Sequence, residues 1–519
     1  MKIEKTKNAR RGIVTGMGLK AVQMVLPFLM RTAMIHYMGI EYLGLNSLFT
    51  SVLHVLNLAE LGVGTAMVFS MYKPIANDDG PTICALMNLY RRYYRIIGIA
   101  VGLLGLLILP MIPSLISGDV PAELNVYVLY LLNLGATVLS YWLFAYRNCL
   151  LQAHQRNDYI SLITIATTFV QYGLQFFVLF VFRDYYLYVI VILATQVLNN
   201  VITALVTIRV YPQYRPQGVL PKEDIRGLNQ KVRDIFTGKL GAVVLNSVDT
   251  IVISAFLGLE ILAIYQNYYF ILTSVLSAFE IVLSTMTAGL GNSFCTESRE
   301  KNYADLEKFT FLLLCCCGVG SCCFLGLYQP FMEIWVGSEL MLDMGAVVCF
   351  AVYFFIYVLN RLVNVYKDAA GLWHEDRFRP LITAGVNLGL NLLLVQFWGV
   401  YGVLLSTVAS MVLVGIPWVL HNLFTLFFTR DRLKQYVTLV LRWILCTVCA
   451  GVLVCVLCAA VRFESWLKLI LCGGISVLIP VALFYMLHRN HRLFRVSMEY
   501  LDRLTAHKLK LRRWLIPEK

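Results

Sequence analysis

Charged residues are scarce in this chain. Only 14% of its 519 residues are charged, whereas 59% are hydrophobic and the mean hydropathy is +0.72. A soluble domain carries about 25% charged and about 45–50% apolar residues. The composition therefore excludes an ordinary soluble protein and indicates a chain that crosses a membrane many times.

Two further absences narrow the range of functions. The sequence contains no G-x-x-x-x-G-K-[ST] segment, which a nucleotide-driven pump would use to hold phosphates. The segments expected outside the membrane are all short, and the longest covers residues 332–343. An integral-membrane enzyme such as a glycan polymerase or ligase would need a larger outer loop for its catalytic groups, so we do not expect an enzyme.

None of the fourteen cysteines lies in a segment that is expected outside the membrane. Disulfide frameworks form in such oxidising surroundings, so we expect none here. Cys446-x-x-Cys449 and Cys455-x-x-Cys458 have the spacing of zinc ligands. Because both pairs lie in one apolar helix with no loop to fold around an ion, we interpret them as packing residues and expect neither a metal nor another cofactor.

Long apolar runs flanked by charges, glycine or proline predict fourteen membrane-spanning helices. The predicted spans are 12–38, 43–72, 96–116, 124–146, 159–182, 186–208, 240–257, 261–291, 309–331, 344–364, 380–397, 400–427, 437–460 and 466–487. The predicted fold class is therefore an all-α integral membrane protein.

The positive charges predict the orientation of these spans. With the N-terminus in the cytoplasm, 37 of the 43 Lys and Arg residues fall on the cytoplasmic side, the distribution that multi-pass proteins favour. We therefore expect a protein of the cytoplasmic membrane with both termini in the cytoplasm. The formal charge of +13 then reflects topology and attraction to anionic membrane lipids, and no nucleic acid partner is expected.

The chain also contains a long internal repeat. At an offset of 219 residues, and of 220 after one insertion, similar residues recur as Lys20 and Lys239, Gly98 and Gly318, Pro110 and Pro330, Arg147 and Lys367, and His154 and His374. Six predicted spans separate the copies, so the repeats run parallel. This predicts an N-terminal lobe at 1–208, a basic cytoplasmic linker at 209–239, a second six-helix lobe at 240–428, two further helices at 429–487 and a basic cytoplasmic tail at 488–519, with alternating access to a central cavity between the lobes.

Ionisable residues within the predicted spans are candidates for function because they are costly in hydrocarbon. Lys20 and Arg31 are eleven residues, or three turns, apart on the first span and so share a face. Arg361 lies in the tenth span. A guanidinium group in a cavity suits bidentate binding of phosphate.

Acidic and neutral polar residues also lie in the predicted spans. Glu60, Asp249 and Glu280 are either ion sites of a coupled transporter or counter-ions to the arginines, for example Asp249 to Arg31. The sequence leaves this choice open. The neutral residues Gln175, Tyr357, Asn360 and Asn364 are candidates for ligand contacts or for hydrogen bonds between helices.

Three runs of the N-terminal third resemble a known family. They are GLNSLF at 44–49, LAELGVGTA at 58–66 and YKPIA at 72–76. These runs resemble the start of Wzx-type polysaccharide flippases, which belong to the superfamily that also contains multidrug-and-toxin extruders and the lipid II flippase. The resemblance covers residues 10–100 well and does not identify the glycan.

The resemblance implies a transporter that moves an undecaprenyl-diphosphate-linked oligosaccharide from the inner to the outer leaflet. In that case Arg31, Lys20 and Arg361 would bind the diphosphate, while Gln175, Asn360, Asn364 and Tyr357 would bind sugars. Expected partners are the lipid-linked oligosaccharide, membrane lipids, Na+ or H+ as coupling ion, and a polysaccharide polymerase complex. A multidrug extruder and a lipid II flippase are the alternatives.

Overall fold

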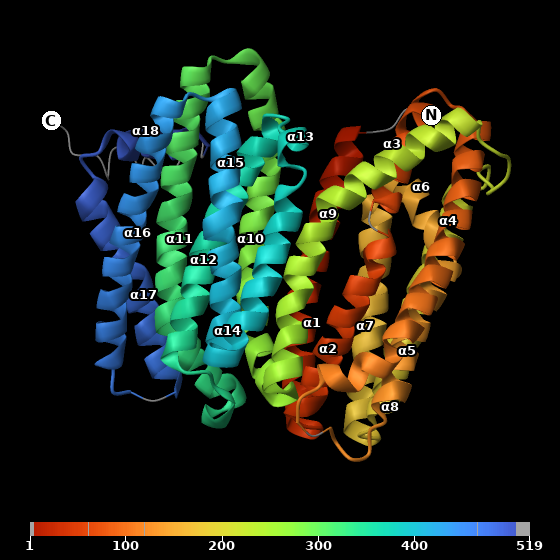
Figure 1. The fold of residues 1–519 in the computed structure, drawn as a ribbon, viewed down its shortest axis with the longest axis horizontal. Coiled ribbons are helices and arrows are strands. Elements are labelled where there is room, and N and C mark those ends of the chain that lie inside the picture. Colours follow the sequence, from red (N-terminus) through yellow and green to blue (C-terminus); the bar gives the residue numbers. More distant parts are fainter. Residues whose placement is uncertain (1–4, 61, 119, 464, 505–519) are drawn as a thin grey trace. The chain divides into compact units, whose positions relative to one another are not determined.

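The computed structural model describes residues 5–60, 62–118, 120–463 and 465–504. All regular elements within these ranges are helical. They form two compact units, Met1–Gln266, called unit 1, and Asn267–Lys519, called unit 2. Figure 1 shows the long helices of each unit running side by side.

Unit 1 is built around pairs of neighbouring helices. Helix α1 packs on α7, α7 on α8, α4 on α5, and α9 on both α2 and α3. The elements are α1 (Lys5–Tyr37), α2 (Ile40–Leu56), η1 (Asn57–Glu60), α3 (Val63–Ala76), α4 (Gly80–Ile108), η2 (Leu109–Leu115), α5 (Val126–Trp142), η3 (Ala145–Arg147), α6 (Asn148–Ala153), α7 (Asn157–Val181), α8 (Tyr185–Val210) and α9 (Lys222–Leu257). Helix α10 (Leu259–Thr296) begins in unit 1 and continues into unit 2.

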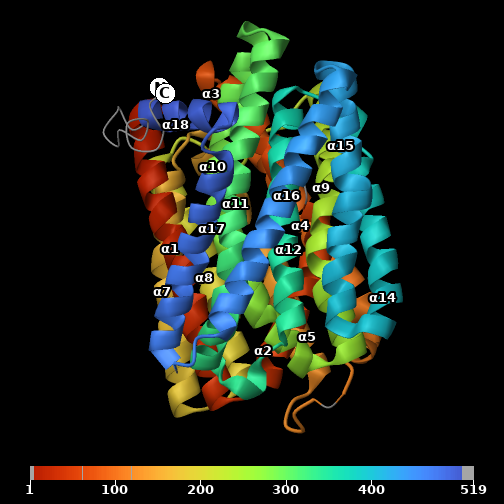
Figure 2. The same cartoon turned by 90° about the vertical axis from the view of Figure 1, so that its left-hand side faces the viewer.

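Unit 2 is centred on α11, which packs against α12, α16 and α17. Its further elements are α11 (Arg299–Val336), η4 (Ser338–Leu340), α12 (Met344–Ala369), α13 (Trp373–Asp376), α14 (Arg379–Ser410), η5 (Met411–Gly415), α15 (Ile416–Asn422), η6 (Leu423–Phe427), α16 (Arg430–Ala459), α17 (Ser465–His488) and α18 (Arg492–Leu504). The last helix contacts α11 and lies across the end of this unit (Figure 2).

Eleven helices of the described chain are long and apolar enough to cross a membrane, or twelve if the bent pair Val126–Trp142 and Ala145–Ala153 is one span. This makes the protein a multi-pass membrane protein. The sequence predicted fourteen spans. Besides the bent pair, two features of the structure account for this higher number. Helix α2, with 17 residues, is shorter than an ordinary span, and the segment Trp373–Phe427 counts once although 55 residues are too many for one crossing.

The long segment Trp373–Phe427 reverses direction at Gly399. That glycine has a φ of 52° within α14, a left-handed conformation that favours glycine because it has no Cβ. Residues on either side then face each other, since the Asn387 amide donates to the Thr407 hydroxyl over 2.9 Å and the Ser406 hydroxyl donates to Asn391 over 2.5 Å. The two sides are antiparallel helices, as the predicted spans 380–397 and 400–427 require.

Two predicted spans of unit 1 contain breaks. The span predicted at 43–72 is divided into α2, η1 and α3, with Gly62 at a φ of 91°. The span predicted at 124–146 bends by 46° where α5 gives way to η3, and Phe144 has a φ of 62° there. Hydropathy could not reveal these breaks because it is averaged over a window as long as a span, and both windows remain apolar overall.

The predicted linker at 209–239 is largely structured. Helix α9 begins at Lys222, directly after Pro221, and carries Glu223 and Asp224 in its first turn, where acidic residues stabilise a helix N-terminus. The preceding segment packs on unit 1, because the Asn88 amide donates to the Gly218 carbonyl over 2.8 Å. The assignment of residues 240–428 to a second lobe stays a proposal.

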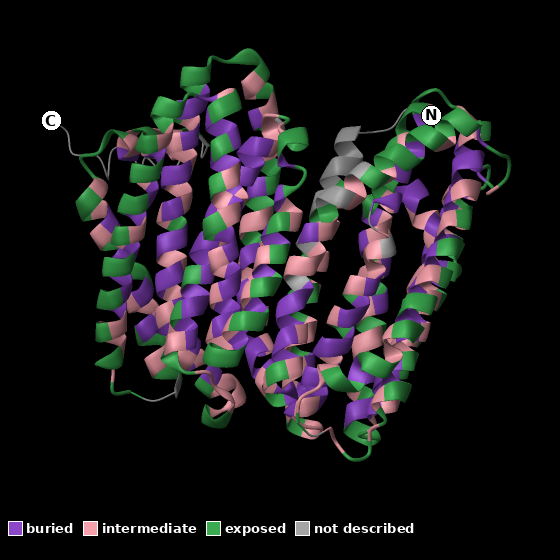
Figure 3. Cartoon of the chain, viewed as in Figure 1, coloured by how far each residue is buried: buried purple, intermediate pink, exposed green. Residues whose placement is uncertain are grey.

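Burial follows the helix faces within each unit. Buried side chains lie on the faces that meet neighbouring helices, and exposed side chains lie on the outer faces (Figure 3). Many exposed residues are large and apolar, among them Leu107 at 71% and Phe397 at 75%. Such exposure suits a surface covered by lipid and would be unfavourable in water.

Candidate functional site

Arg31 lies among aromatic hydroxyl groups in unit 1. It sits in the last third of α1 and is half-buried. Its electrostatic partners include Tyr188 of α8 and Tyr172 of α7. Tight packing of α1 on α7 brings these side chains together. The arrangement holds a guanidinium group beside neutral hydrogen-bonding groups.

Gln175 lies close to the same tyrosines. It is one turn beyond Tyr172 on α7, and Tyr188 interacts with both Gln175 and Arg31. Only 1% of Gln175 is exposed, and its amide interacts with the Tyr188 hydroxyl. A buried amide therefore lies beside Arg31 among membrane-spanning helices.

Lys20 is exposed in unit 1, whereas Asp249 is buried there. Lys20 is exposed on α1, eleven residues before Arg31, which corresponds to about 16 Å along the helix. Asp249 is 7% exposed on α9, and its neighbour Thr250 accepts a hydrogen bond from Gln266 over 2.8 Å. The predicted pairing of Asp249 with Arg31 stays a prediction.

Glu60 lines a cavity of about 450 Å³ in unit 1. The hydroxyl of Tyr94 donates to the Glu60 carboxylate, and Tyr90 donates to Tyr94 over 2.8 Å. The hydroxyl of Tyr141 donates to Asn57 over 2.8 Å, one turn before Glu60. Aromatic hydroxyls therefore surround this carboxylate.

The rest of the cavity wall is mostly polar. It is formed by Gly64, Thr65, Ser140, Phe144, Ala145, Asn148, Cys149, Gln152, Ile160, Thr164, Gln196, Asn199, Asn200 and Thr203. These residues come from α3, α5, η3, α6, α7 and α8, and Phe144 lies in the break between α5 and η3. Lys239 of α9 donates to Thr65 over 3.1 Å, which places a positive charge beside one wall residue.

In unit 2, Arg361 and Glu280 form an ion pair. The Arg361 Nε donates to Glu280 over 2.8 Å, and Tyr357 donates to the other carboxylate oxygen over 3.3 Å. The side chains of Arg361 and Glu280 are 35% and 32% exposed. The space beside the pair does not admit a water molecule. Three of the residues predicted from the sequence thus lie together, with Glu280 as counter-ion to Arg361.

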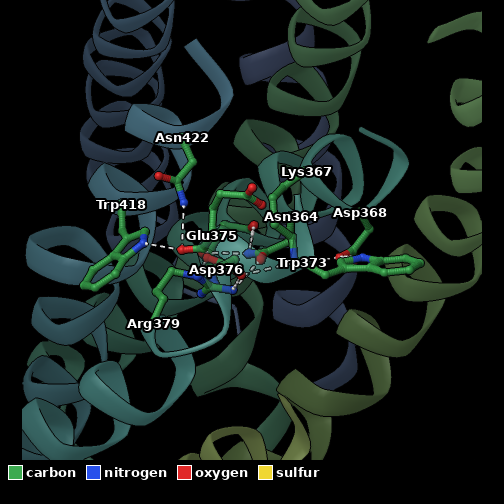
Figure 4. A network of polar contacts seen from close by, with 10 residues as sticks. Asn364, Lys367, Asp368, Trp373, Glu375, Asp376, Arg379, Trp418 and Asn422 are labelled. Carbon is green, nitrogen blue, oxygen red and sulfur yellow. Dashed lines mark hydrogen bonds and ion pairs between the residues drawn. The ribbon is translucent and has the colours of Figure 1, made fainter. Parts of the chain in front are cut away.

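Asn360 directly precedes Arg361 on α12, and Asn364 lies one turn beyond Asn360. The Asn364 amide donates to the Asn360 carbonyl over 2.7 Å and to its side-chain oxygen over 3.1 Å. The Asn364 oxygen accepts from Arg379 over 2.7 Å. Asn364 therefore belongs to a larger polar network (Figure 4).

That network joins the end of α12 to the start of α14. Arg379 holds Asp376 through two hydrogen bonds of 2.5 and 2.8 Å, and Lys367 contacts Asp376 at 3.1 Å and Asp368 at 2.6 Å. Trp373 also donates to Asp368 over 3.1 Å. Two basic and two acidic groups balance each other, so this network holds unit 2 together without external charge.

The tyrosines around Glu60 and the amide of Asn148 were not identified from the sequence. Tyr90 and Tyr94 are four residues apart on α4, which is the spacing of one helix face. The sequence shows that spacing, but tyrosine is also common where helices pack together, so the spacing alone did not indicate a site. Only the breaks after α2 and α5 bring these residues to one cavity. Among the described residues, no group of three His, Cys, Asp or Glu side chains is arranged to hold a metal ion.

Comparison with known families gives a match over more than half of the chain. Residues 9–288 match the family described as "Polysaccharide biosynthesis protein". The matched part contains Arg31, Gln175, the Glu60 cavity and Glu280. No curated protein matches the chain.

Several solved transporters are similar in structure. The lipid II flippase MurJ in its inward closed conformation has a TM-score of 0.66 and 12% identity, covering 92% of this chain and 99% of its own. An inward-facing multidrug resistance MATE family transporter of the MOP superfamily has a TM-score of 0.58 and 15% identity, covering 79% and 95%. The Vibrio cholerae MATE transporter VcmN has a TM-score of 0.51 and 12% identity, covering 80% and 95%.

These similarities confirm the predicted all-α membrane fold and the resemblance to flippases of this superfamily. At such low identity, the solved structures establish the fold and leave the substrate open.

Proposed function

The chain belongs to the polysaccharide biosynthesis protein family, and on that premise we propose that it flips an undecaprenyl-diphosphate-linked oligosaccharide. Transport would proceed from the inner to the outer leaflet of the cytoplasmic membrane, by alternating access between two parallel lobes. Both termini would lie in the cytoplasm. The observation that carries the proposal is the position of Arg31 beside Tyr172, Tyr188 and buried Gln175 within membrane-spanning helices.

Arg31 is the proposed main contact of the diphosphate. A diphosphate cannot cross hydrocarbon without compensation of its charge. A guanidinium group can donate two parallel hydrogen bonds to phosphate oxygens, and neighbouring tyrosine hydroxyls can donate further ones. Lys20, exposed on the same helix, would attract the diphosphate at the cytoplasmic mouth.

Arg361 would contact the diphosphate only after its ion pair with Glu280 opens. In the present conformation the 2.8 Å bond to Glu280 already compensates its charge. A phosphate group that displaces the carboxylate would couple substrate binding to a rearrangement of α10 and α12. We therefore propose that Glu280 acts as counter-ion, and that Glu60 and Asp249 are the candidates for a coupling Na+ or H+.

Sugar contacts are proposed for Gln175, Tyr357, Asn360 and Asn364. The amide of Gln175, which interacts with Tyr188, has two donors and one acceptor oxygen and can also bond to a hydroxyl group. The other three already make hydrogen bonds within unit 2, so a sugar would have to share or replace these bonds. Membrane lipids and a polysaccharide polymerase complex are further proposed partners.

A deletion of the gene tests this function. Polyprenyl-linked intermediates would be analysed by mass spectrometry, with accessibility labelling of the two leaflets. We expect a diphosphate-linked oligosaccharide to accumulate in the inner leaflet, because it can no longer cross. Accumulation of lipid II instead would assign a lipid II flippase. Altered drug sensitivity without any accumulation would contradict the flippase proposal and favour a multidrug extruder.

A further inference from the structure

Two broken helices of unit 1 meet at the Glu60 cavity. One break separates η1 from α3 and contains Gly62, next to the cavity residues Glu60 and Gly64. The other separates α5 from η3 and contains Phe144, which lines the cavity. Irregular backbone at membrane depth is tolerated only where it is enclosed by protein or lines a polar cavity. Broken helices in transporters often mark a binding site.

The backbone at Phe144 is unfavourable for a non-glycine residue. Its φ of 62° lies in the left-handed region, which costs about 1–3 kcal/mol and tends to be found at functional sites. The conformation turns the chain between α5 and η3, so that Tyr141, Phe144 and Asn148 all reach the cavity wall. The break therefore gives the cavity three of its side chains.

The functional groups that line the cavity indicate which class of ligand it can bind. Aromatic, amide and hydroxyl groups surround one carboxylate, and the cavity wall contains no Lys or Arg. Lys239 lies beside the wall at Thr65, but a phosphate group inside the cavity would still lie next to the Glu60 carboxylate. The volume of about 450 Å³ falls within the range of about 300–1,000 Å³ for small-molecule pockets and far exceeds the space that one monovalent cation needs. A neutral, hydroxyl-rich ligand fits best.

One polar atom of the wall lacks a partner. The side-chain oxygen of Asn148 is buried and accepts no hydrogen bond from the described residues. Gln196, also on the wall, is exposed. Both amides can therefore bond to hydroxyl groups of a ligand, while the rings of Tyr90, Tyr94 and Tyr141 offer apolar faces.

The cavity shares two helices with the Arg31 cluster. On α7, Thr164 of the cavity precedes Gln175 by eleven residues, and on α8, Asn199 of the cavity follows Tyr188 by eleven. Each separation corresponds to about 16 Å along the helix. That distance exceeds one sugar ring, so a saccharide attached to a diphosphate at Arg31 would reach the cavity with a sugar beyond the first.

We propose that the Glu60 cavity binds a distal sugar of the transported lipid-linked saccharide, with Asn148 and Gln196 as hydrogen-bonding residues. The inference rests on the proposed function. It adds a saccharide site inside unit 1, separate from the diphosphate contact at Arg31. Glu60 accepts a hydrogen bond from Tyr94, and because each carboxylate oxygen can accept more than one hydrogen bond, a sugar hydroxyl can share this group.

Binding of two probes tests the proposal. The first probe is the undecaprenyl-diphosphate-linked oligosaccharide extracted from the deletion strain, and the second is undecaprenyl diphosphate without sugar. Purified wild-type protein in lipid nanodiscs is compared with Gln196→Leu and Asn148→Leu, and with Gln396→Leu as control, an exposed position of α14 outside the cavity. Gln196→Leu is expected to weaken binding of the saccharide probe about five- to tenfold, the effect of one lost hydrogen bond, and to leave the second probe unchanged.

Asn148→Leu separates ligand binding from folding. Removal of the unpartnered buried oxygen is expected to raise the thermal unfolding temperature, while binding of the saccharide probe weakens as in Gln196→Leu. A structural role alone would lower stability and affect both probes equally. If Asn148→Leu does not fold, Gln196→Leu still decides the question.

Two results would overturn the cavity assignment. They are unchanged binding of both probes by Gln196→Leu and equal loss of both probes. Failure of the wild-type protein to bind either probe would instead contradict the proposed function itself.

Discussion

Unit 1 and unit 2 use corresponding positions of the repeat differently. At the offset of 219 residues, Glu60 corresponds to the position directly before Glu280, and at the offset of 220, Tyr141 corresponds to Arg361. In unit 1, Glu60 and Tyr141 line a cavity of about 450 Å³. In unit 2, Arg361 and Glu280 meet at 2.8 Å, and the space between them and their helix neighbours is too small for a ligand. An arginine beside the acid yields an internal ion pair, whereas a tyrosine leaves a site for a ligand.

The backbone differs at the same positions. Unit 1 is broken after Leu56 and after Trp142, whereas the corresponding parts of α10 and α12 are continuous helix. A continuous helix satisfies its own backbone groups, but a break needs neighbouring side chains to satisfy them. The breaks of unit 1 therefore coincide with the Glu60 cavity, whereas the Arg361 and Glu280 pair lies between continuous helices. The following predictions test that distinction.

The largest expected difference is between Arg31 and Arg361, because replacing Arg31 should reduce transport far more than replacing Arg361. Arg31→Ala is expected to abolish transport, with a loss of about a hundredfold or more, because two charge-assisted hydrogen bonds to a diphosphate would disappear. Arg361→Ala should have a much smaller effect because Glu280 already compensates that charge. Leaflet-resolved mass spectrometry of the lipid-linked oligosaccharide measures both.

The amounts of each variant in the membrane serve as the control for folding and insertion. Normal transport by Arg31→Ala would remove the diphosphate hypothesis. Equal losses in both variants would remove the distinction between the units.

Loss of an acid from the buried network around Asp376 in unit 2 should lower the stability more than loss of a comparable acid in unit 1. Asp376→Asn leaves Arg379 and Lys367, which are 9% and 7% exposed, without their shared acid. Breaking a buried ion pair in this way costs about 3–5 kcal/mol. In unit 1, Asp158 pairs at 3.0 Å with Arg156, whose side chain is 19% exposed, so Asp158→Asn should cost about half as much.

Thermal unfolding of the purified variants in detergent measures this difference. An equal or smaller decrease for Asp376→Asn would show that the network is solvated in the membrane and does not hold unit 2 together.

The break in unit 1 can be tested at Gly62. A Cβ added there would lie 2.8 Å from the Val232 carbonyl oxygen, and the φ of 91° is unfavourable for alanine. Gly62→Ala should therefore destabilise by about 1–3 kcal/mol. Gly289→Ala, in the continuous helix α10 with open space around it, should stabilise by about 0.5–1 kcal/mol.

Chemical denaturation of each variant gives these free energies. A stabilising Gly62→Ala would mean that α2 and α3 can form one continuous helix, and that the cavity does not depend on the break.

The smallest expected effect concerns the Arg361 and Glu280 pair. Because both side chains are about one-third exposed, solvent screens their attraction. A double-mutant cycle with Arg361→Ala and Glu280→Gln should give a coupling free energy of about 1 kcal/mol. A coupling near zero would show that the two groups do not depend on each other, and would return Glu280 to the candidates for an ion site.

Much of the fold could be predicted because the physical signals are local. Runs of apolar residues long enough for a bilayer, the distribution of Lys and Arg, and the repeat need no knowledge of contacts. Glu280, Tyr357 and Arg361 could each be identified as intramembrane polar residues for the same reason. Their pairing could not, because helix periodicity gives the face of one helix and not the helix that it meets.

For the candidate site in unit 1, the sequence likewise identified single residues but not the contacts between them. Arg31, Gln175 and Glu60 were all identified as polar residues in apolar surroundings. Their assignment to two separate groups, with Arg31 and Gln175 beside Tyr188 and with Glu60 beside Tyr94, depends on which helices pack together. Tyr94 and Asn148 had no distinguishing signal, because tyrosine and asparagine are common in helix interfaces.

The sequence by itself determined that this is an all-helical multi-pass membrane protein, since burial of apolar surface in lipid and the cost of unpaired backbone groups leave few other solutions. It also determined the family, through residues 9–288. Only the tertiary structure decided which of two similar acids has an arginine partner and which one faces a cavity. That choice depends on helix breaks at Gly62 and Phe144, where packing energy outweighs local backbone preference.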